Sequence, residues 1–161
     1  MDSIDLRILS ILQRDANARL AQIAAAVKLS PNPCWRRINK MESEGVITGR
    51  VALLDPAKLG AGTLVFIKLK TACSSEEEAE RVGEAIAALP AITEVHRVTG
   101  GDLMLKAQIG RVSDYDRLYR RLIAVAPVTE INATFAMATF KQTTAIPLPN
   151  EDEGEDKRDA A

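Results

Sequence analysis

Two prolines separated by one residue, Pro31 and Pro33, are the feature that most constrains how this chain can fold. Proline has no backbone N–H, so it breaks a helix interior, but it is tolerated in the first turn, where N–H groups have no intrahelical partner. Ser30, which precedes the prolines, is a favoured N-cap residue. The segment SPNPCWRRINKMESEG therefore predicts a helix over residues 31–44, with Gly45 as its C-terminal cap.

The predicted helix has two chemically different faces. Cys34, Ile38 and Met41 recur at spacings of four and three, which places them on one buried side. An arginine can read guanine and an asparagine adenine in the major groove, and a helix N-terminus attracts phosphates. A solvated basic surface is the alternative interpretation. We predict DNA contacts from the first turn and the polar face of this helix, which hold Ser30, Asn32, Pro33, Arg36, Arg37, Asn39 and Lys40.

Trp35 has two interpretations, because it lies at the edge of the apolar face. It packs in the core or it stacks on a sugar or base, and its position between Cys34 and Ile38 favours the core. Cys34 is interpreted as a buried apolar residue rather than a redox switch. The chain has only two cysteines, no CxxC motif and a single histidine, His96, so we expect no metal site of the usual Cys/His kind.

Two shorter helices are predicted before residue 30. Apolar residues at helical spacing predict a helix over 4–14 and another over 20–27. A short strand over 50–54 is expected to follow the third helix, which gives residues 1–54 the outline of a winged helix-turn-helix DNA-binding domain. Residues 55–62 contain one proline and two glycines and are predicted to be a linker.

The pattern changes at Thr63 from helices to alternating strands and helices. Apolar residues alternate in the first predicted strand, and the order of elements is βαββαβ. This order predicts an α+β fold in which residues 63–148 form a ferredoxin-like sandwich with both helices on one face. The elements are expected within 63–72 (strand), 74–90 (helix), 92–98 and 102–109 (strands), 113–125 (helix) and 130–140 (strand).

Charge is distributed unevenly along the chain. Residues 1–50 carry a net charge of +3, residues 51–150 are neutral, and residues 151–161 carry −4. The basic first third favours an anionic partner, whereas the acidic tail, 149–161, is expected to be disordered and to repel DNA. No apolar run reaches the roughly 18 residues of a membrane span, and the N-terminus does not resemble a signal peptide. We therefore expect a cytoplasmic, nucleoid-associated protein without membrane contact.

The order and spacing of these motifs resemble the Lrp/AsnC family of transcription regulators, particularly its leucine-responsive branch. The resemblance rests on D-x-x-D-x-x-I-L-x-x-L from Asp2, on LSPNPCWRRI at 29–38, and on MESEGVITGRVALLDPAKLG at 41–60. It implies double-stranded DNA binding through the N-terminal domain and dimers formed mainly through the C-terminal sheet. It further implies assembly to tetramers or octamers, and control by a small effector, usually an amino acid.

The family resemblance also implies an effector site at the turn between the second and third strands of the C-terminal domain. The matching residues are Thr99, Gly100, Gly101 and Asp102, one residue shorter than the family pattern T/S-G-x-x-D. Leucine specificity is therefore not implied, and Asp102 is either a ligand for an effector's ammonium group or a turn-capping residue. No cofactor, metal or catalytic residue is expected.

Two other functions stay open at the sequence level. An architectural protein that bends DNA without an effector would fit the shortened turn. An enzyme similar to the siroheme decarboxylases would fit the two-domain order, but those proteins carry catalytic histidines and this chain has only His96. We therefore predict a regulator rather than an enzyme.

Overall fold

The computed structural model describes residues 1–149, which divide into two compact units. Of the described residues, the first unit comprises Met1–Ala52 and residues 141–149, and the second is Leu53–Phe140. The sequence places residues 141–148 in the C-terminal domain, and this boundary stays a prediction. The predicted acidic tail lies outside the described residues from position 150 on. Within residues 1–149, the helices are all too short or too polar to cross a membrane.

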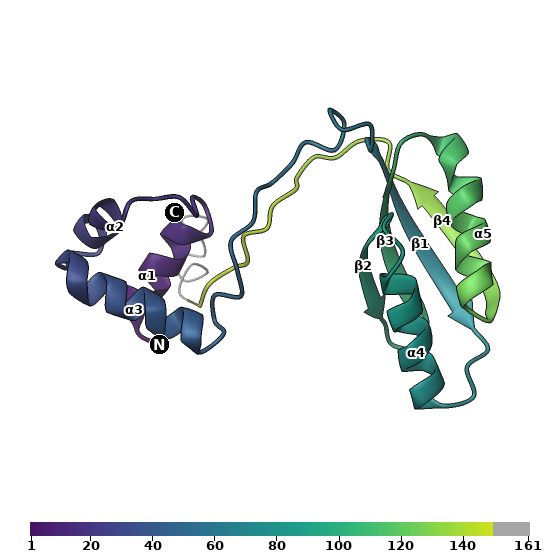
Figure 1. Cartoon of the computed structure of the whole chain (residues 1–161), viewed down its shortest axis with the longest axis horizontal. Helices are drawn as coiled ribbons and strands as arrows, with labels where there is room; N and C mark the ends of the chain where they lie inside the picture. Colours follow the sequence, from purple (N-terminus) through teal and green to yellow (C-terminus); the bar gives the residue numbers. More distant parts are fainter. Residues whose placement is uncertain (150–161) are drawn as a thin grey trace, which may run out of the picture. The chain divides into compact units, whose positions relative to one another are not determined.

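The N-terminal unit contains the three predicted helices, α1 (Ser3–Leu12), α2 (Leu20–Ala26) and α3 (Pro31–Ser43) (Figure 1). One apolar side of each helix faces the other two, so that a small core forms between them. Burial of these side chains is the main force holding three short helices together, since isolated helices of this length are marginal in water. The core residues are Ile8, Ile23, Ala24, Val27, Cys34, Ile38 and Met41.

The ends of α3 lie where the prolines and Gly45 predicted them. The first intrahelical bond runs from the Cys34 N–H to the Ser30 carbonyl over 3.3 Å, so both prolines sit where a donor is not needed. Gly45 adopts a φ of +73°, and the Val46 N–H reaches back 2.9 Å to the Met41 carbonyl. A left-handed residue after the last turn is the usual way to end a helix, and glycine adopts it without steric cost.

The predicted strand over 50–54 is wrong. Residues 46–62 form no strand in the structure, and the turn at 56–60 is the only regular feature there. A strand needs a partner for its N–H and C=O groups, and the described part of the N-terminal unit offers none. Val51 and Leu53 are correspondingly 77% and 73% exposed.

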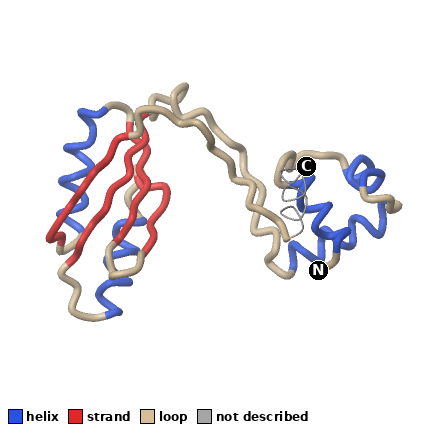
Figure 2. The backbone as a smooth tube through the Cα atoms, turned by 180° about the vertical axis from the view of Figure 1, so that it is seen from behind, coloured by secondary structure: helices blue, strands red, loops and turns tan. Residues whose placement is uncertain are grey.

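The C-terminal unit has the predicted βαββαβ order. Its four strands form one antiparallel sheet in the order β2-β3-β1-β4, and α4 and α5 cover one face of it (Figures 1 and 2). The last strand ends at Phe135, five residues before the predicted end. The elements are β1 (Thr63–Thr71), α4 (Glu76–Ala87), β2 (Ile92–Arg97), β3 (Leu103–Ile109), α5 (Tyr115–Val125) and β4 (Val128–Phe135).

The core of this unit lies between the sheet and its two helices. Val65, Ile67 and Leu69 of β1 are fully buried, whereas Lys68 and Lys70 point to the opposite, helix-free face. This alternation follows from the two-residue repeat of a strand, as the sequence predicted. The helices contribute a smaller set of buried residues, namely Val82, Ile86, Leu118 and Leu122.

Candidate nucleic-acid interface

The exposed side of α3 is polar and basic. Asn32, Arg36 and Lys40 recur every four residues and are all exposed, on the side of the helix opposite the buried Cys34 and Ile38. This side is therefore the part of the helix that an external partner can reach. Asn39 is half-buried at its edge.

Arg36 and Lys40 are the cations of this exposed side. Within residues 1–149, Arg36 takes part in no ion pair, and Lys40 has only a loose contact of 3.7 Å with Glu44 one turn along the helix. Exposed pairs of this kind contribute a few tenths of a kcal/mol and do not fix a side chain. Both cations are therefore available to an anionic partner.

Arg37, which the sequence grouped with the DNA-contacting residues, has a different environment. Its Nη1 lies 2.7 Å from Asp2 Oδ2 and 2.8 Å from Asp5 Oδ1, at the start of α1. The same two acids form the N-terminal cap of α1, because Asp2 Oδ1 accepts the Ile4 and Asp5 N–H groups and Asp5 Oδ2 accepts that of Asp2. Arg37 therefore ties α3 to the first turn of α1.

The protonation equilibria reflect this contact. The hydrogen bonds that Arg37 donates to Asp5 and then to Asp2 raise the pKa of its guanidinium. The pKa of Asp2 is lowered, first by the backbone N–H of Asp5 and then by Arg37. Both shifts favour the charged forms, as expected for an ion pair inside a capping motif.

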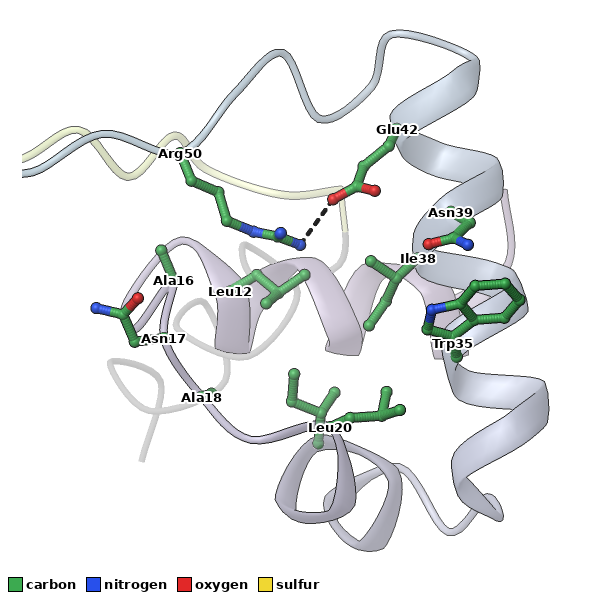
Figure 3. A pocket seen from close by; sticks show the side chains of 11 residues that line it. Leu12, Ala16, Asn17, Ala18, Leu20, Trp35, Ile38, Asn39, Glu42 and Arg50 are labelled. Atoms are coloured by element: carbon green, nitrogen blue, oxygen red, sulfur yellow. Dashed lines mark ion pairs between the residues drawn. The ribbon is translucent and has the colours of Figure 1, made fainter.

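Trp35 is exposed, contrary to the preference for core packing derived from the sequence. Its side chain is 54% exposed on the flank of α3, where a hollow of about 220 Å³ lies between α1, α2 and α3 (Figure 3). Leu12 and Leu20 line the apolar part of this hollow, and Arg50 Nη2 contacts Glu42 Oε1 over 2.7 Å at its rim. Trp35 therefore presents an aromatic surface beside the exposed polar side of α3.

The turn predicted as the effector site joins β2 to β3. Gly100 and Gly101 have φ values of +92° and +85°, which are left-handed conformations that favour glycine. Thr99, Gly100 and Gly101 are exposed in the protomer. The turn is thus a tight hairpin, as its composition predicted.

Asp102, at the end of this turn, has a partner that the sequence did not reveal. Lys68 Nζ of β1 lies 2.9 Å from Asp102 Oδ2, and the Asp102 side chain is only 17% exposed. The alternation of β1 did place Lys68 on the helix-free face, but only the strand order β3-β1 brings it to the turn. An acidic group and a basic group therefore meet at the predicted effector turn.

Family models match both units of the chain. Residues 1–48 match the winged helix-turn-helix DNA-binding model, and residues 64–146 match the Lrp/AsnC ligand binding domain. The chain belongs to the Lrp/AsnC family. It is accordingly a DNA-binding transcription regulator with a ligand-binding domain.

Relatives within the Lrp/AsnC family align over nearly the whole chain. The glutamate uptake regulatory protein of Zymomonas mobilis is 39% identical over 150 residues, which cover 92% of each chain. An AsnC family regulator from Agrobacterium tumefaciens is 41% identical with a TM-score of 0.87, covering 91% of this chain and 97% of that one. A regulator of Neisseria meningitidis, solved as a complex with L-methionine, is 25% identical with a TM-score of 0.84, covering 91% and 96%.

Proposed function

We propose that this Lrp/AsnC protein binds specific DNA sequences by placing α3 in the major groove. The observation that carries the proposal is the division of α3 into a buried apolar side and an exposed side with Asn32, Arg36 and Lys40. The second helix of a helix-turn-helix motif enters the groove in this way, with its exposed residues facing base edges and phosphates. DNA then lies against residues that are not needed for the core of the unit.

The DNA-contacting residues have different roles in this proposal. Arg36 reads a base or neutralises a phosphate, Lys40 neutralises a phosphate, and Asn32 and Asn39 supply hydrogen bonds to bases. Pro31 and Pro33 carry no N–H, so the first turn offers few backbone donors to a phosphate and side chains must supply the contacts. The Ser30 side chain can make one such contact, because it forms no cap hydrogen bond with α3. Arg37 positions the helix and does not read bases.

We propose that an amino acid binds at the Thr99–Asp102 turn and alters DNA affinity. Asp102 accepts the effector's ammonium group in competition with Lys68, and Lys68 is then free to meet the effector's carboxylate. The Thr99 hydroxyl and the Gly100 N–H form no hydrogen bond within the described residues and supply further donors. The relative that was solved with L-methionine supports an amino acid as the ligand class.

We further propose that the protein acts in the cytoplasm as a dimer that assembles to tetramers or octamers. The exposure of Thr99, Gly100 and Gly101 supports assembly, because a second copy can cover the turn and enclose an effector there. The curated relatives are named as regulators, which favours regulation over the enzyme alternative. The architectural alternative differs from our proposal in lacking an effector response and in binding DNA with little sequence preference.

Fluorescence anisotropy tests DNA binding directly. Labelled duplex DNA from upstream of the protein's own gene is titrated at two salt concentrations, with unlabelled random DNA as competitor. We expect competitor-resistant binding that weakens steeply with salt. Absence of binding at low salt would contradict the proposal, and equal loss to random competitor would favour the architectural alternative.

The effector is tested by repeating the titration with each common L-amino acid. We expect one of them to shift the binding curve of the unsubstituted chain and to have no effect on Asp102→Asn. Glu130→Gln is the matched control, because Glu130 pairs with Lys70 over 3.0 Å on the same helix-free face of the sheet. A response that survives in Asp102→Asn would place the effector elsewhere.

A further inference from the structure

The chain returns to the DNA-binding unit after the last strand of the sheet. Gln13, directly after α1, donates from Nε2 to the Ile146 carbonyl and accepts the Ile146 N–H at Oε1, with both contacts at 3.1 Å. Leu148, two residues further on, is only 8% exposed. A side-chain amide paired with both backbone groups of one residue acts as a clasp. Residues from 150 on therefore start at the DNA-binding unit.

The segment that follows this clasp is strongly acidic. Residues 150–161, NEDEGEDKRDAA, contain six acidic and two basic residues and carry a net charge of −4. The first 50 residues, in contrast, carry +3. The two charges are opposite in sign and similar in size. The clasp at Ile146 ties the chain just before the acidic segment to the unit that carries the positive charge.

The acids of the N-terminal unit leave the exposed side of α3 basic. Asp2 and Asp5 are engaged by Arg37, and Glu42 is engaged by Arg50. Among residues 1–149, Glu44 is the one acid in ionic contact with the exposed cations, at 3.7 Å from Lys40. Within the described residues, the surface around Arg36 thus attracts an anionic partner.

The acidic segment is long enough to reach this surface. Twelve extended residues span at most about 40 Å, at roughly 3.3–3.6 Å per residue. A compact unit of some 50 residues has a radius of gyration near 10 Å, and therefore a diameter of about 26 Å. Tethering over so short a distance gives an effective concentration in the millimolar range, about that needed for a weak electrostatic contact.

We propose that residues 150–161 cover the Arg36 and Lys40 side of α3 and compete with DNA for it. This inference rests on the proposed DNA contacts of α3 and adds a restraint on them. Both random and specific DNA must displace the acidic segment, so the segment lowers the affinity of the chain for both. Random DNA, which is held by phosphate contacts alone and binds more weakly, is the first to fall below measurable binding.

The competition has a distinct salt signature. Each protein–phosphate contact releases counterions and changes the slope of log affinity against log salt concentration by about 0.9. When DNA displaces the acidic segment, that segment takes counterions up again, so the net release is smaller. Neutralising the segment therefore makes the slope steeper by about 1–2, which corresponds to roughly 3-fold in affinity per exposed cation between 200 and 50 mM salt.

The test compares the full chain with a neutral-tail variant, in which Glu151, Asp152, Glu153 and Glu155 are changed to their amides, so that residues 150–161 carry no net charge. The probe is a labelled 30-base-pair duplex of random sequence, titrated from 50 to 200 mM salt. We expect the neutral-tail variant to bind several-fold more tightly at 50 mM, with a gap that closes at 200 mM. Circular dichroism verifies that both chains have the same helix and strand content.

Two outcomes separate this inference from the proposed function. Equal affinities and slopes for both chains would overturn the inference and leave DNA binding intact. Absence of DNA binding by either chain at 50 mM would overturn both. A gap that is the same at all salt concentrations would also overturn the inference, because it would not arise from counterion exchange.

The clasp is tested by Gln13→Ala in both backgrounds. We expect Gln13→Ala to tighten random DNA binding of the chain with the acidic tail, and to have no effect on the neutral-tail variant. Unchanged binding in the acidic-tail background would overturn the anchoring step.

A synthetic peptide of residues 150–161 tests the contact surface. Added at millimolar concentration to the neutral-tail variant, it should displace DNA and change the fluorescence of Trp35, the only tryptophan of the chain. Failure of the peptide to do either would overturn the assignment of α3 as the contact surface.

Discussion

The two units of the molecule are stabilised in different ways. The N-terminal unit has seven buried core residues on three short helices, whereas the sheet unit has thirteen and a continuous set of strand pairings. The smaller core is supplemented by arginines that join elements of the N-terminal unit. These contacts are Arg37 with Asp2 and Asp5, Arg50 with Glu42, and Arg7 Nη2 with the Ala26 carbonyl at 2.7 Å.

The lysine ion pairs of the sheet lie on its surface and do not join separate helices. Lys68, Lys70 and Lys106 pair with acids on the helix-free side of the sheet, beside a backbone ladder that is already complete. Surface pairs of this kind contribute little to stability. The number of DNA contacts therefore cannot be inferred from the net charge of a unit, because some of its cations pair within the protein. In the N-terminal unit, Arg7, Arg37 and Arg50 contact other elements of the same unit, while Arg36 faces outward.

The largest expected effect is on the small core. Ile8 is fully buried, and Ile8→Ala should cost about 2–5 kcal/mol, a large part of the stability of so small a unit. Trp35 fluorescence reports unfolding of this unit, because it is the only tryptophan. Urea titration followed by Trp35 should show an earlier transition.

Ile67→Ala is the matched control in the sheet unit, where Ile67 is equally buried. It should shift the transition seen by far-ultraviolet circular dichroism and leave the Trp35 transition in place. If both variants move the Trp35 transition equally, the two units unfold together and the comparison fails.

The next effect separates the two adjacent arginines. Arg36→Ala should weaken DNA binding by about 1–3 kcal/mol, roughly 5- to 150-fold, without changing Tm. Arg37→Ala should lower the Tm of the N-terminal unit, because it leaves Asp2 and Asp5 without their cation. Anisotropy and Trp35-detected melting measure the two quantities on the same samples. An unchanged Tm for Arg37→Ala, with DNA binding lost as in Arg36→Ala, would return Arg37 to the DNA interface.

A smaller effect compares one glycine from each unit. Gly45 has a φ of +73° at the end of α3, so Gly45→Ala should destabilise the N-terminal unit by about 1–2 kcal/mol. Gly83 lies within α4, and a Cβ there would meet open space. Gly83→Ala should therefore stabilise the sheet unit by about 0.5–1 kcal/mol. Urea denaturation of both variants should show shifts of opposite sign, and shifts of the same sign would contradict this account.

Local patterns in the sequence predicted the elements well. The position of the prolines fixed the start of α3, and the two-residue alternation identified the buried side of β1. These features depend on neighbouring residues alone, so they can be read without the tertiary structure. Trp35 was misplaced because a residue at the edge of a helical face packs or stays exposed according to what the next helix offers.

Contacts between distant residues could not be predicted from the same patterns. Arg37 and Asp2 are 35 positions apart, and Gln13 and Ile146 are 133 apart. Arg37 is predicted to contact DNA because its type and neighbours are those of a DNA-binding helix. Its contacts with Asp2 and Asp5 depend on how α1 packs against α3, and an arginine near an anion can serve either purpose.

The smallest expected effect is the acid sensitivity of the cap that joins α1 to α3. The pKa of Asp2 is lowered in the folded state by the Asp5 N–H and by Arg37, and the unfolded value is near 3.9. A lowered pKa stabilises the fold above the unfolded value, and this contribution is lost as pH falls through the folded pKa. The Trp35-detected Tm should therefore decline below about pH 4.

Asp2→Asn keeps an N-cap residue but removes the titrating group, so its Tm should be lower than that of the unsubstituted chain at pH 6 and should decline less between pH 4 and 2.5. Glu77→Gln is the control, because it removes an acid from α4 in the other unit, and its Trp35-detected curve should match that of the unsubstituted chain. If Asp2→Asn declines as steeply as the unsubstituted chain, other carboxylates govern the acid response of the N-terminal unit. The link between α1 and α3 would then depend on Asp5, which is the more buried of the two acids at 14% side-chain exposure against 51% for Asp2.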